Sequence, residues 1–344
     1  MSRVLVTGGA GYIGSHCCKA LAAAGFEPVA FDNLSTGHRS AVLWGPLIEG
    51  DMRDAGALRE AFRQAQPQAV VHLAALSIVG ESERRPDLYY DVNVVGTLRL
   101  LEAMTAGAVR ALVFSSTAAV YGEPDAVPIA ETAAQRPVNV YGATKRACER
   151  MMQDFDAAFG LRSVRLRYFN AAGADPDAAI GEWHEPETHL IPLVLDVAIG
   201  RRPWLSIFGA DYPTPDGTAI RDYIHVTDLA EAHVATLRHL LDGGDSAALN
   251  LGTGEGASVR EVVRAVEGVT GRPVAVREAP RRAGDPPVLV ADPRHAEQLL
   301  SWRAGRTLNA MVEDAWRWHR ALASPLGGDA APIAYAAMAS RMAG

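Results

Sequence analysis

Short apolar runs alternate with amphipathic stretches along the first half of the chain. Apolar runs bounded by turn-forming residues are typical of buried strands, and they lie at residues 3–7, 28–32, 69–74, 111–116 and 163–170. Helical spacing of apolar residues follows Tyr12 and recurs at "AGALREAFRQA" and at 91–107. Because strands and helices alternate, we predict an α/β, Rossmann-type doubly wound parallel sheet with helices on both faces.

The pattern loosens after residue 170. A stretch rich in Asp, Glu, Pro and Gly at 171–188 predicts a long loop, and the elements beyond it are shorter and more mixed. We therefore expect a Rossmann domain at 1–170, to which a later segment at about 220–255 returns. A smaller mixed α/β C-terminal substrate region is expected at 171–330, and an Ala/Gly-rich tail at 331–344.

Composition argues against several classes of protein. The chain has 344 residues and a net charge of −7 without a long basic run, so no nucleic-acid partner is expected. No apolar stretch approaches the ~20 residues that span a bilayer, so no membrane association is expected. The three cysteines form an odd, sparse set without metal spacing. Together with a strand-like start that leaves no room for a signal peptide, they favour a cytoplasmic location.

The segment "TGGAGYIG" at 7–14 carries the first candidate chemistry. Gly8, Gly11 and Gly14 form a variant of the dinucleotide-binding turn, between a predicted strand and a predicted helix. Asp32 ends the next strand, where a carboxylate accepts hydrogen bonds from an adenosine ribose and repels a 2′-phosphate, which favours NAD over NADP. Asp51 is a candidate for the adenine side, and a helix N-cap is an equally good interpretation of it.

Tyr141 and Lys145 stand four residues apart in "YGATK", on one face of a predicted helix. Lowering the pKa of tyrosine from ~10 to ~7 requires a preference of ~4 kcal/mol for the phenolate. One ammonium at ~4 Å in an effective dielectric of ~20 supplies about that much. Lys145 is therefore predicted to make Tyr141 a proton acceptor. Taken without the glycine turn, a packed Tyr141 and a solvated Lys145 would be the better interpretation.

Longer motifs resemble the extended short-chain dehydrogenase/reductase family and, within it, the UDP-galactose 4-epimerases. The similarity runs from "VTGGAGYIGSH" through "VFSSTAAVYG", "YGATK" and "RYFNAAGA" to "APRRAGDPP", and the block "DYPTPDGTAIRDYIHVTDLA" is its most specific part. The resemblance implies NAD as cofactor, a UDP-sugar as substrate and a homodimer packed through the helices at about 90–106 and 141–158. No metal is expected.

The resemblance also implies roles for single residues. It makes Tyr141 the catalytic base, Lys145 its cofactor-binding partner and Thr117 the group that hydrogen-bonds the O4 atom of the sugar. NAD-binding positions are Gly8, Gly11, Tyr12, Ile13, Gly14, Asp32, Asn33, Asp51, Met52, Leu73, Ala74, Ala75, Asn93, Ser115, Tyr141, Lys145 and Tyr168. Substrate-binding positions are Thr117, Tyr141, Asn170, His189, Leu190, Phe208, Arg221, Arg282, Asp285 and Leu289.

The implied reaction is reversible C4 epimerisation of UDP-galactose and UDP-glucose through a 4-keto sugar, with transient hydride transfer to NAD. Ala118 and Ala119 stand where related dehydratases carry acids, so elimination of water is not expected. Leu289 falls at a gatekeeper position for the C2 substituent, which predicts weak activity on N-acetylated sugars. A UDP-N-acetylhexosamine or UDP-pentose epimerase remains an alternative, and so does a non-catalytic NAD-binding module.

The segment "GEWHEPETH" at 181–189 combines two histidines with three glutamates. Such a mixture suits a metal ion, but the spacing matches no known ligand pattern. We therefore interpret this segment as a solvated loop.

Overall fold

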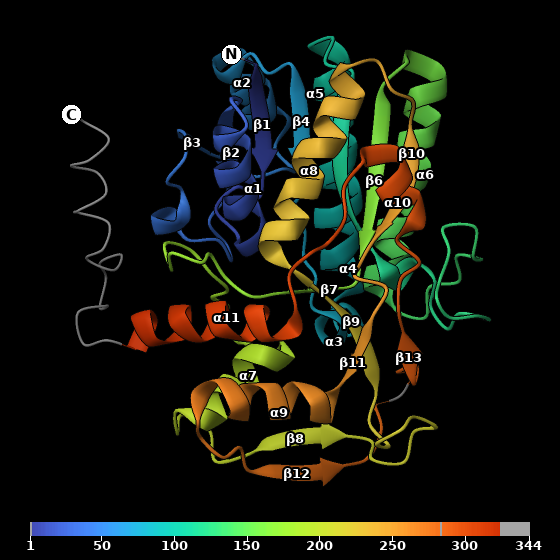
Figure 1. Ribbon diagram of the computed structural model, residues 1–344. Helices are drawn as coiled ribbons and strands as arrows, with labels where there is room; N and C mark the ends of the chain where they lie inside the picture. Colours follow the sequence, from blue (N-terminus) through green and yellow to red (C-terminus); the bar gives the residue numbers. More distant parts are fainter. Residues whose placement is uncertain (1, 283, 324–344) are drawn as a thin grey trace.

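The computed structural model describes residues 2–282 and 284–323 (Figure 1). The predicted tail at 331–344 lies outside the described residues.

A seven-stranded sheet, parallel throughout, forms the larger part of the molecule, in the strand order β10-β6-β5-β4-β1-β2-β3. Its strands are β1 (Arg3–Thr7), β2 (Glu27–Asp32), β3 (Leu47–Glu49), β4 (Ala69–His72), β5 (Ala111–Thr117), β6 (Arg162–Tyr168) and β10 (Ala247–Leu251). The strand order changes direction between β1 and β4, and doubly wound sheets bind ligands at the carboxyl ends of the strands beside such a point. The predicted fold class is confirmed.

Helices cover both faces of this sheet, because successive side chains of a strand point to opposite sides. Val4 and Val6 of β1 face a core that includes residues of α1 (Tyr12–Ala23), α8 (Val226–Leu241) and α10 (Arg294–Leu300). Leu5 faces the opposite core, which includes residues of α2 (Ala55–Ala65), α5 (Gly96–Ala106) and α6 (Val140–Phe159). Burial on both sides explains why the strands are apolar without interruption.

A smaller group of elements lies beyond one end of the large sheet (Figure 1). One sheet joins β7 (Asn170–Ala172), β9 (Ile220–His225), β11 (Gly256–Ser258) and β13 (Val288–Leu289), and a parallel pair joins β8 (Leu205–Phe208) and β12 (Val276–Ala279). Helices α7 (Leu190–Ala198), α9 (Val259–Thr270) and α11 (Leu308–Ala323) share a third core with these strands.

Short helical segments fill the connections. They are η1 (Arg39–Ala41), α3 (Val79–Ser82), α4 (Pro86–Tyr89), the π-helical turn η2 (Tyr90–Val95) and η3 (Ala118–Val120). The helix predicted at 91–107 is therefore η2 followed by α5. No helix within the described residues is long and apolar enough to cross a membrane.

Two sequence predictions need correction here. The apolar run 163–170 is not one strand, because β6 ends at Tyr168 and β7 begins at Asn170 and pairs with β9 in the smaller sheet. The segment 220–255 does not return to the large sheet as a whole, because β9 belongs to the smaller sheet while α8 and β10 join the larger part. Apolar periodicity cannot tell which sheet a strand joins.

Candidate active site

The turn between β1 and α1 leaves no room for side chains. A Cβ atom on Gly8 would lie 2.6 Å from the amide nitrogen of Ala74, and one on Gly14 would lie 2.0 Å from the carbonyl oxygen of Gly8. Gly8 also has a φ of 75°, a left-handed value that glycine adopts without strain. The N-cap residue of α1 is Gly11, which has no side chain to accept from the first N–H groups of the helix. These groups therefore suit an anion such as a pyrophosphate.

The other predicted NAD residues near this turn lie in the first turn of α1 and directly after β4. Tyr12 opens α1 and its hydroxyl donates to the carbonyl of Gly173 at 2.7 Å, and Ile13 packs against the core under α1. The amides of Leu73 and Ala74 donate to the carbonyl of Thr7 at 2.9 and 3.0 Å. Residues 73–75 thus leave β4 directly beside the glycine turn.

Asp32 is the last residue of β2, where it lies buried. Its carboxylate accepts from the backbone amides of Ala10 at 3.0 Å and Leu34 at 2.8 Å. Burial raises the pKa of Asp32, and these two hydrogen bonds oppose the rise. The carboxylate therefore also ties the glycine turn to the end of β2.

Asp51 is not a helix N-cap, because Asp54 caps α2 through the amides of Gly56 and Ala57. Asp51 instead accepts from Asn33 at 3.0 Å and pairs with Arg53 at 2.8 Å. The hydrogen bond from Arg53 is the main reason that the pKa of Asp51 lies well below its usual range. The N-cap interpretation was wrong, and the adenine-side role stays a prediction.

Four hydroxyl groups gather at the carboxyl ends of β5 and β6. Thr117 ends β5 and is the register partner of Tyr168, which ends β6. The hydroxyls of Ser115 and Tyr168 are hydrogen-bonded to each other. Tyr141 reaches this group from the first turn of α6, and its phenol interacts with the Thr117 side chain. The predicted catalytic Thr117 and Tyr141 are therefore neighbours.

Three side chains hold the first turn of α6 and thereby Tyr141. Asn139 caps the helix by accepting from the amide of Gly142 at 2.8 Å. Glu83 accepts from the amide of Val140 at 2.8 Å, and Ser82 from the amide of Tyr141 at 3.2 Å. None of these three residues was predicted from the sequence. Asn139 carried the usual signal of an N-cap before a helix, whereas nothing local marks Ser82 and Glu83, which lie 59 and 57 residues from their partners.

The predicted effect of Lys145 on Tyr141 is not present in this structure. Burial raises the pKa of Tyr141 to about 12, and the hydrogen bond with Thr117 is what opposes the rise. Lys145 is buried, donates to the carbonyl of Ser115 at 2.8 Å, and lies 4.8 Å from the ring centre of Phe114. Burial lowers its own pKa to about 8, and the nearby Cys148 and Glu149 oppose the decrease.

Asn93 connects the cofactor side to α6. Its side chain exchanges hydrogen bonds with the backbone of Leu76, at 2.9 and 3.0 Å, and donates to Thr144 at 3.1 Å. Asn93 is buried, and so is Met52, a predicted cofactor residue that lies beside Gly96 of α5. Asn93 thereby holds the segment after β4 in place.

The predicted diphosphate and nucleoside residues form a second group. Arg221 of β9 is paired with Asp285, and the guanidinium of Arg282 lies 4.1 Å from the ring centre of Phe208. Arg282 and Asp285 line a cavity of about 600 Å³ together with Tyr212. Two guanidinium groups and an exposed aromatic ring can bind a diphosphate and stack on a base.

Leu289 lies between the hydroxyl cluster and the predicted diphosphate and nucleoside residues. It is the register partner of Arg221, and it packs against the apolar cluster that contains Ala118, the residue after Thr117. The remaining substrate candidates flank the same region, since Asn170 opens β7, His189 is the N-cap of α7 and Leu190 begins α7.

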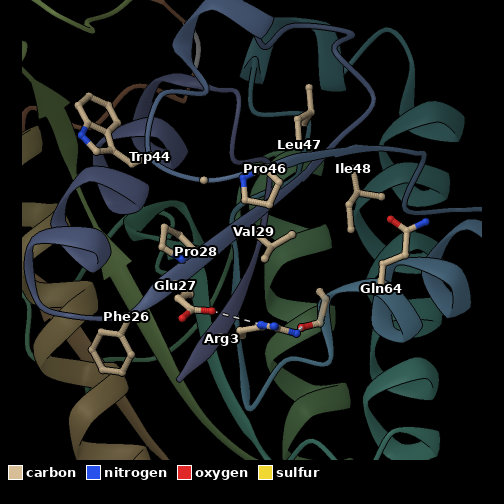
Figure 2. A pocket seen from close by; sticks show the side chains of 12 residues that line it. Arg3, Phe26, Glu27, Pro28, Val29, Trp44, Pro46, Leu47, Ile48 and Gln64 are labelled. Carbon is tan, nitrogen blue, oxygen red and sulfur yellow. Dashed lines mark hydrogen bonds and ion pairs between the residues drawn. The ribbon is translucent and has the colours of Figure 1, made fainter. Parts of the chain in front are cut away.

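A further cavity of about 600 Å³ lies at the other end of β1 and β2 (Figure 2). Apolar residues such as Phe26, Trp44 and Leu47 line it, and Arg3 is paired with Glu27 beside it at 3.2 Å. None of the predicted site residues lines this cavity. It is therefore separate from the candidate active site.

The segment 181–189 is a loop whose residues are mostly exposed, as predicted, but its charged side chains are more ordered than a solvated loop implies. Glu182 is buried, and the Nδ1 atom of His189 lies 2.7 Å from its carboxylate. Burial opposes the positive charge on the two histidines, yet the neighbouring glutamates raise the pKa of His184 to about 9 and that of His189 to about 10. This segment is a closed cluster of charges next to the substrate candidates.

Comparison with known proteins agrees with the motifs. The chain is 54% identical over 318 residues to the UDP-glucose 4-epimerase of Rhizobium meliloti (strain 1021), covering 92% of this chain and 97% of that protein. The crystal structure of UDP-glucose 4-epimerase from Brucella ovis in complex with NAD is 51% identical and has a TM-score of 0.90, covering 92% and 98% of the two chains.

A third relative is the UDP-glucose 4-epimerase of Stenotrophomonas maltophila, whose structure holds NAD and formylated UDP-arabinopyranose. It is 43% identical with a TM-score of 0.91, covering 94% of this chain and 99% of that one. The resemblance drawn from the motifs is confirmed. Residues 4–252 match the family described as NAD dependent epimerase/dehydratase, and this chain therefore belongs to that family.

Proposed function

We propose that this protein interconverts UDP-galactose and UDP-glucose by inverting C4 of the hexose, with NAD as its cofactor. The observation that carries the proposal is the meeting of Thr117, Tyr141, Ser115 and Tyr168 at the carboxyl ends of β5 and β6. Relatives about half identical to this chain are UDP-glucose 4-epimerases, and one of them is solved with NAD.

The residues fit NAD. The glycine turn has a Cβ-free surface and a helix N-terminus for the pyrophosphate, and Asp32 lies at the end of β2 for the adenosine ribose. Bound NAD would take up the C4 hydride and return it to the opposite face of the sugar.

The hydroxyl cluster would accept the proton of the O4 atom of the sugar and return it. Tyr141 accepts this proton and later returns it, with Thr117 hydrogen-bonded between the phenol and the sugar. Lys145 holds the carbonyl of Ser115 and keeps a positive charge beside the cofactor site. Arg221, Arg282, Asp285 and Phe208 hold the UDP part, so that the hexose can turn while the nucleotide stays bound.

Leu289 supports UDP-hexoses as the main substrates. Its side chain packs on the cluster that follows Thr117, close to where the sugar would lie. A leucine there leaves less space for an N-acetyl group than a small residue would. UDP-N-acetylglucosamine should therefore react more slowly than UDP-galactose.

We also propose a homodimer. Val95, Leu98, Met151 and Phe155 are at least partly exposed on η2, α5 and α6, and α5 packs beside α6. An apolar face made of two helices suits a second copy of the same face in a four-helix bundle.

The three cysteines are free thiols, which supports a reducing, cytoplasmic compartment.

We further propose that the larger part, residues 1–170 with α8, β10 and α10, binds NAD, while most of 171–330 binds the UDP-sugar. The predicted cofactor residues all lie within 1–170, and seven of the ten predicted substrate residues lie within 171–330. The other three, Thr117, Tyr141 and Asn170, belong to 1–170, at the side that would face the sugar.

The test is a coupled assay that detects UDP-glucose formed from UDP-galactose. Tyr141→Phe should reduce kcat by about a hundred- to ten-thousand-fold, because it removes the group that transfers the proton. Tyr90→Phe is the matched control, since it removes an exposed phenol oxygen and should leave the rate unchanged. A wild-type rate in Tyr141→Phe would dismiss the proposed base. Absence of turnover in the intact protein would favour a non-catalytic NAD-binding module.

A further inference from the structure

Four potential metal ligands converge in the segment that connects β7 to α7. Glu182, His184, Glu187 and His189 each present one nitrogen or oxygen atom, and these atoms all lie within 4.8 Å of one another. The segment spans only residues 182–189, so one short stretch of backbone supplies the whole set. None of these residues takes part in the proton or hydride chemistry proposed above.

Hydrogen bonds account for the position of His189 but not for that of His184. The Nδ1 atom of His189 lies 2.7 Å from a Glu182 oxygen and 3.1 Å from a Glu187 oxygen, as in ordinary hydrogen bonds. The Nδ1 atom of His184 lies 3.4 Å from Glu182 and 3.7 Å from Glu187. This atom is shielded from solvent and has no hydrogen-bond partner within the described residues. A buried polar atom without a partner is costly, so the position of His184 needs another cause.

The histidine and glutamate atoms are close enough together to surround one ion. Bonds of about 2.0–2.1 Å in tetrahedral geometry put neighbouring ligand atoms about 3.3–3.4 Å apart. The separations between the two Nδ1 atoms and the nearest oxygens of Glu182 and Glu187 run from 2.7 to 3.7 Å, close to that value, with Glu187 presenting a different oxygen to each histidine. An ion at the centre would give His184 the partner that it lacks.

Burial and charge agree with a cation. The side chain of Glu182 is 6% exposed and that of Glu187 is 15% exposed. The carbonyl of Glu182 accepts from the indole of Trp318 at 2.9 Å, which fixes this end of the segment against α11. Two carboxylates held together away from water need compensating positive charge. One divalent ion balances both when the two histidines bind it as neutral ligands.

We propose that Glu182, His184, Glu187 and His189 form a site for a single divalent transition-metal ion of the zinc class. Two imidazole nitrogens and two carboxylate oxygens in a small tetrahedron suit Zn²⁺. Mg²⁺ and Ca²⁺ prefer six or more ligands that are all oxygen, and this site does not offer them. This assignment replaces the expectation that the protein has no metal site.

The ion has a structural role at the junction of the two parts of the molecule. The ring of Tyr12, the first residue of α1, meets His184 edge-on with 6.3 Å between ring centres. His189 is the N-cap of α7. The metal would therefore fix the His184 ring against which Tyr12 packs, and its binding would stabilise the folded chain.

The experiment measures metal binding by the full chain, without substrate, so its outcome is independent of the proposed epimerase activity. Purified protein is treated with a chelator, dialysed and titrated with Zn²⁺ by calorimetry, and its metal content is then determined by mass spectrometry. We expect one Zn²⁺ per chain and a higher melting temperature than that of the stripped protein. Co²⁺ in its place should give the intense visible bands of tetrahedral coordination.

Two variants and a control keep the proposal falsifiable. His184→Ala and Glu187→Gln should each weaken Zn²⁺ binding by at least about a hundredfold. His295→Ala removes an exposed histidine of α10 outside the cluster and should bind Zn²⁺ like the wild type. Wild-type binding by both His184→Ala and Glu187→Gln would overturn the proposal. A stripped protein that takes up no Zn²⁺ and shows no change in melting temperature would do so as well.

Discussion

Tyr141 illustrates how strongly surroundings govern a single catalytic candidate. With a pKa of about 12, raised by burial, its phenol is ionised to roughly one part in 100,000 at pH 7. The hydroxyl of Thr117 opposes this effect, but the ammonium of Lys145 is engaged with the carbonyl of Ser115. A phenolate at neutral pH therefore requires positive charge beyond what the chain alone places next to Tyr141.

We predict that NAD lowers the pKa of Tyr141, because a positively charged nicotinamide ring stabilises a phenolate beside it. Absorbance of tyrosinate near 295 nm, followed during a pH titration, measures this effect. Subtracting the titration of Tyr141→Phe isolates the one residue from the other tyrosines. We expect a pKa near 12 in protein freed of NAD and a decrease of at least about one unit when NAD is added. Equal values in both samples would contradict the proposed role of the cofactor charge.

Helix α6 shows how an element positions that residue. Its first turn carries Tyr141, and the amides of this turn donate to Asn139, Glu83 and Ser82. The start of the helix therefore depends on the loop that precedes it and on α3. A shift of this turn would move the phenol away from Thr117.

We predict that Asn139→Ala lowers the free energy of unfolding by about 1 kcal/mol, because the amide of Gly142 loses its cap. The kcat should decrease as well, since the turn that holds Tyr141 becomes less ordered. Urea unfolding and the coupled assay measure the two effects. Asn139→Ser retains a capping oxygen and is the control, so equal losses in both variants would argue against the cap.

Helix α8 carries a histidine that should make the protein sensitive to acid. His233 is fully buried, its Nδ1 atom donates to the carbonyl of Leu229 at 2.8 Å, and its Nε2 atom has no partner within the described residues. Burial lowers its pKa from 6.5 to about 4, although the hydrogen bond to Leu229 opposes the decrease. The folded state therefore resists a proton that the unfolded state accepts.

The direction in which stability changes with pH follows from this difference in pKa. Between pH 6.5 and pH 4 the unfolded chain binds more protons, so the stabilisation is complete above pH 6.5 and is lost as the pH falls toward 4. From pH 7.5 to pH 5 the loss due to His233 is about 2 kcal/mol. Urea unfolding at both pH values should show a smaller difference for His233→Leu than for the wild type. The control His295→Leu, on the surface of α10, should behave like the wild type. An unchanged difference in His233→Leu would contradict this linkage.

At the level of the whole molecule, the face formed by η2, α5 and α6 is the candidate interface between two copies. Val95 is 37% exposed on this face. Apolar side chains of this kind are stabilised when a second copy covers them.

We predict that Val95→Asp weakens the dimer at least about tenfold, because it places a charge in an apolar interface. Size-exclusion chromatography with light scattering measures the mass at several protein concentrations. Val276→Asp is the matched control, since Val276 is a valine of 38% exposure on β12, outside the face, and should leave the mass unchanged. A wild-type protein that is a monomer at all concentrations would dismiss the interface.

Features that depend on neighbouring residues were accessible from the sequence alone. Strand β1 and helix α2 have the predicted bounds, since their periodicity and their turn residues are local signals. The glycine turn was recognisable because steric limits on Gly8 and Gly14 act within a few residues. The helical spacing of Tyr141 and Lys145 was correct for the same reason.

Contacts between distant segments were decided only by the tertiary structure. Lys145 bonds to a residue 30 positions away, Arg221 to one 64 positions away, and Asn170 joins a sheet different from that of the strand before it. The burial that raises the pKa of Tyr141 likewise arises when separate elements pack together. Residue order limits backbone geometry over a few positions, whereas charges, burial and partners depend on which segments the whole fold brings into contact.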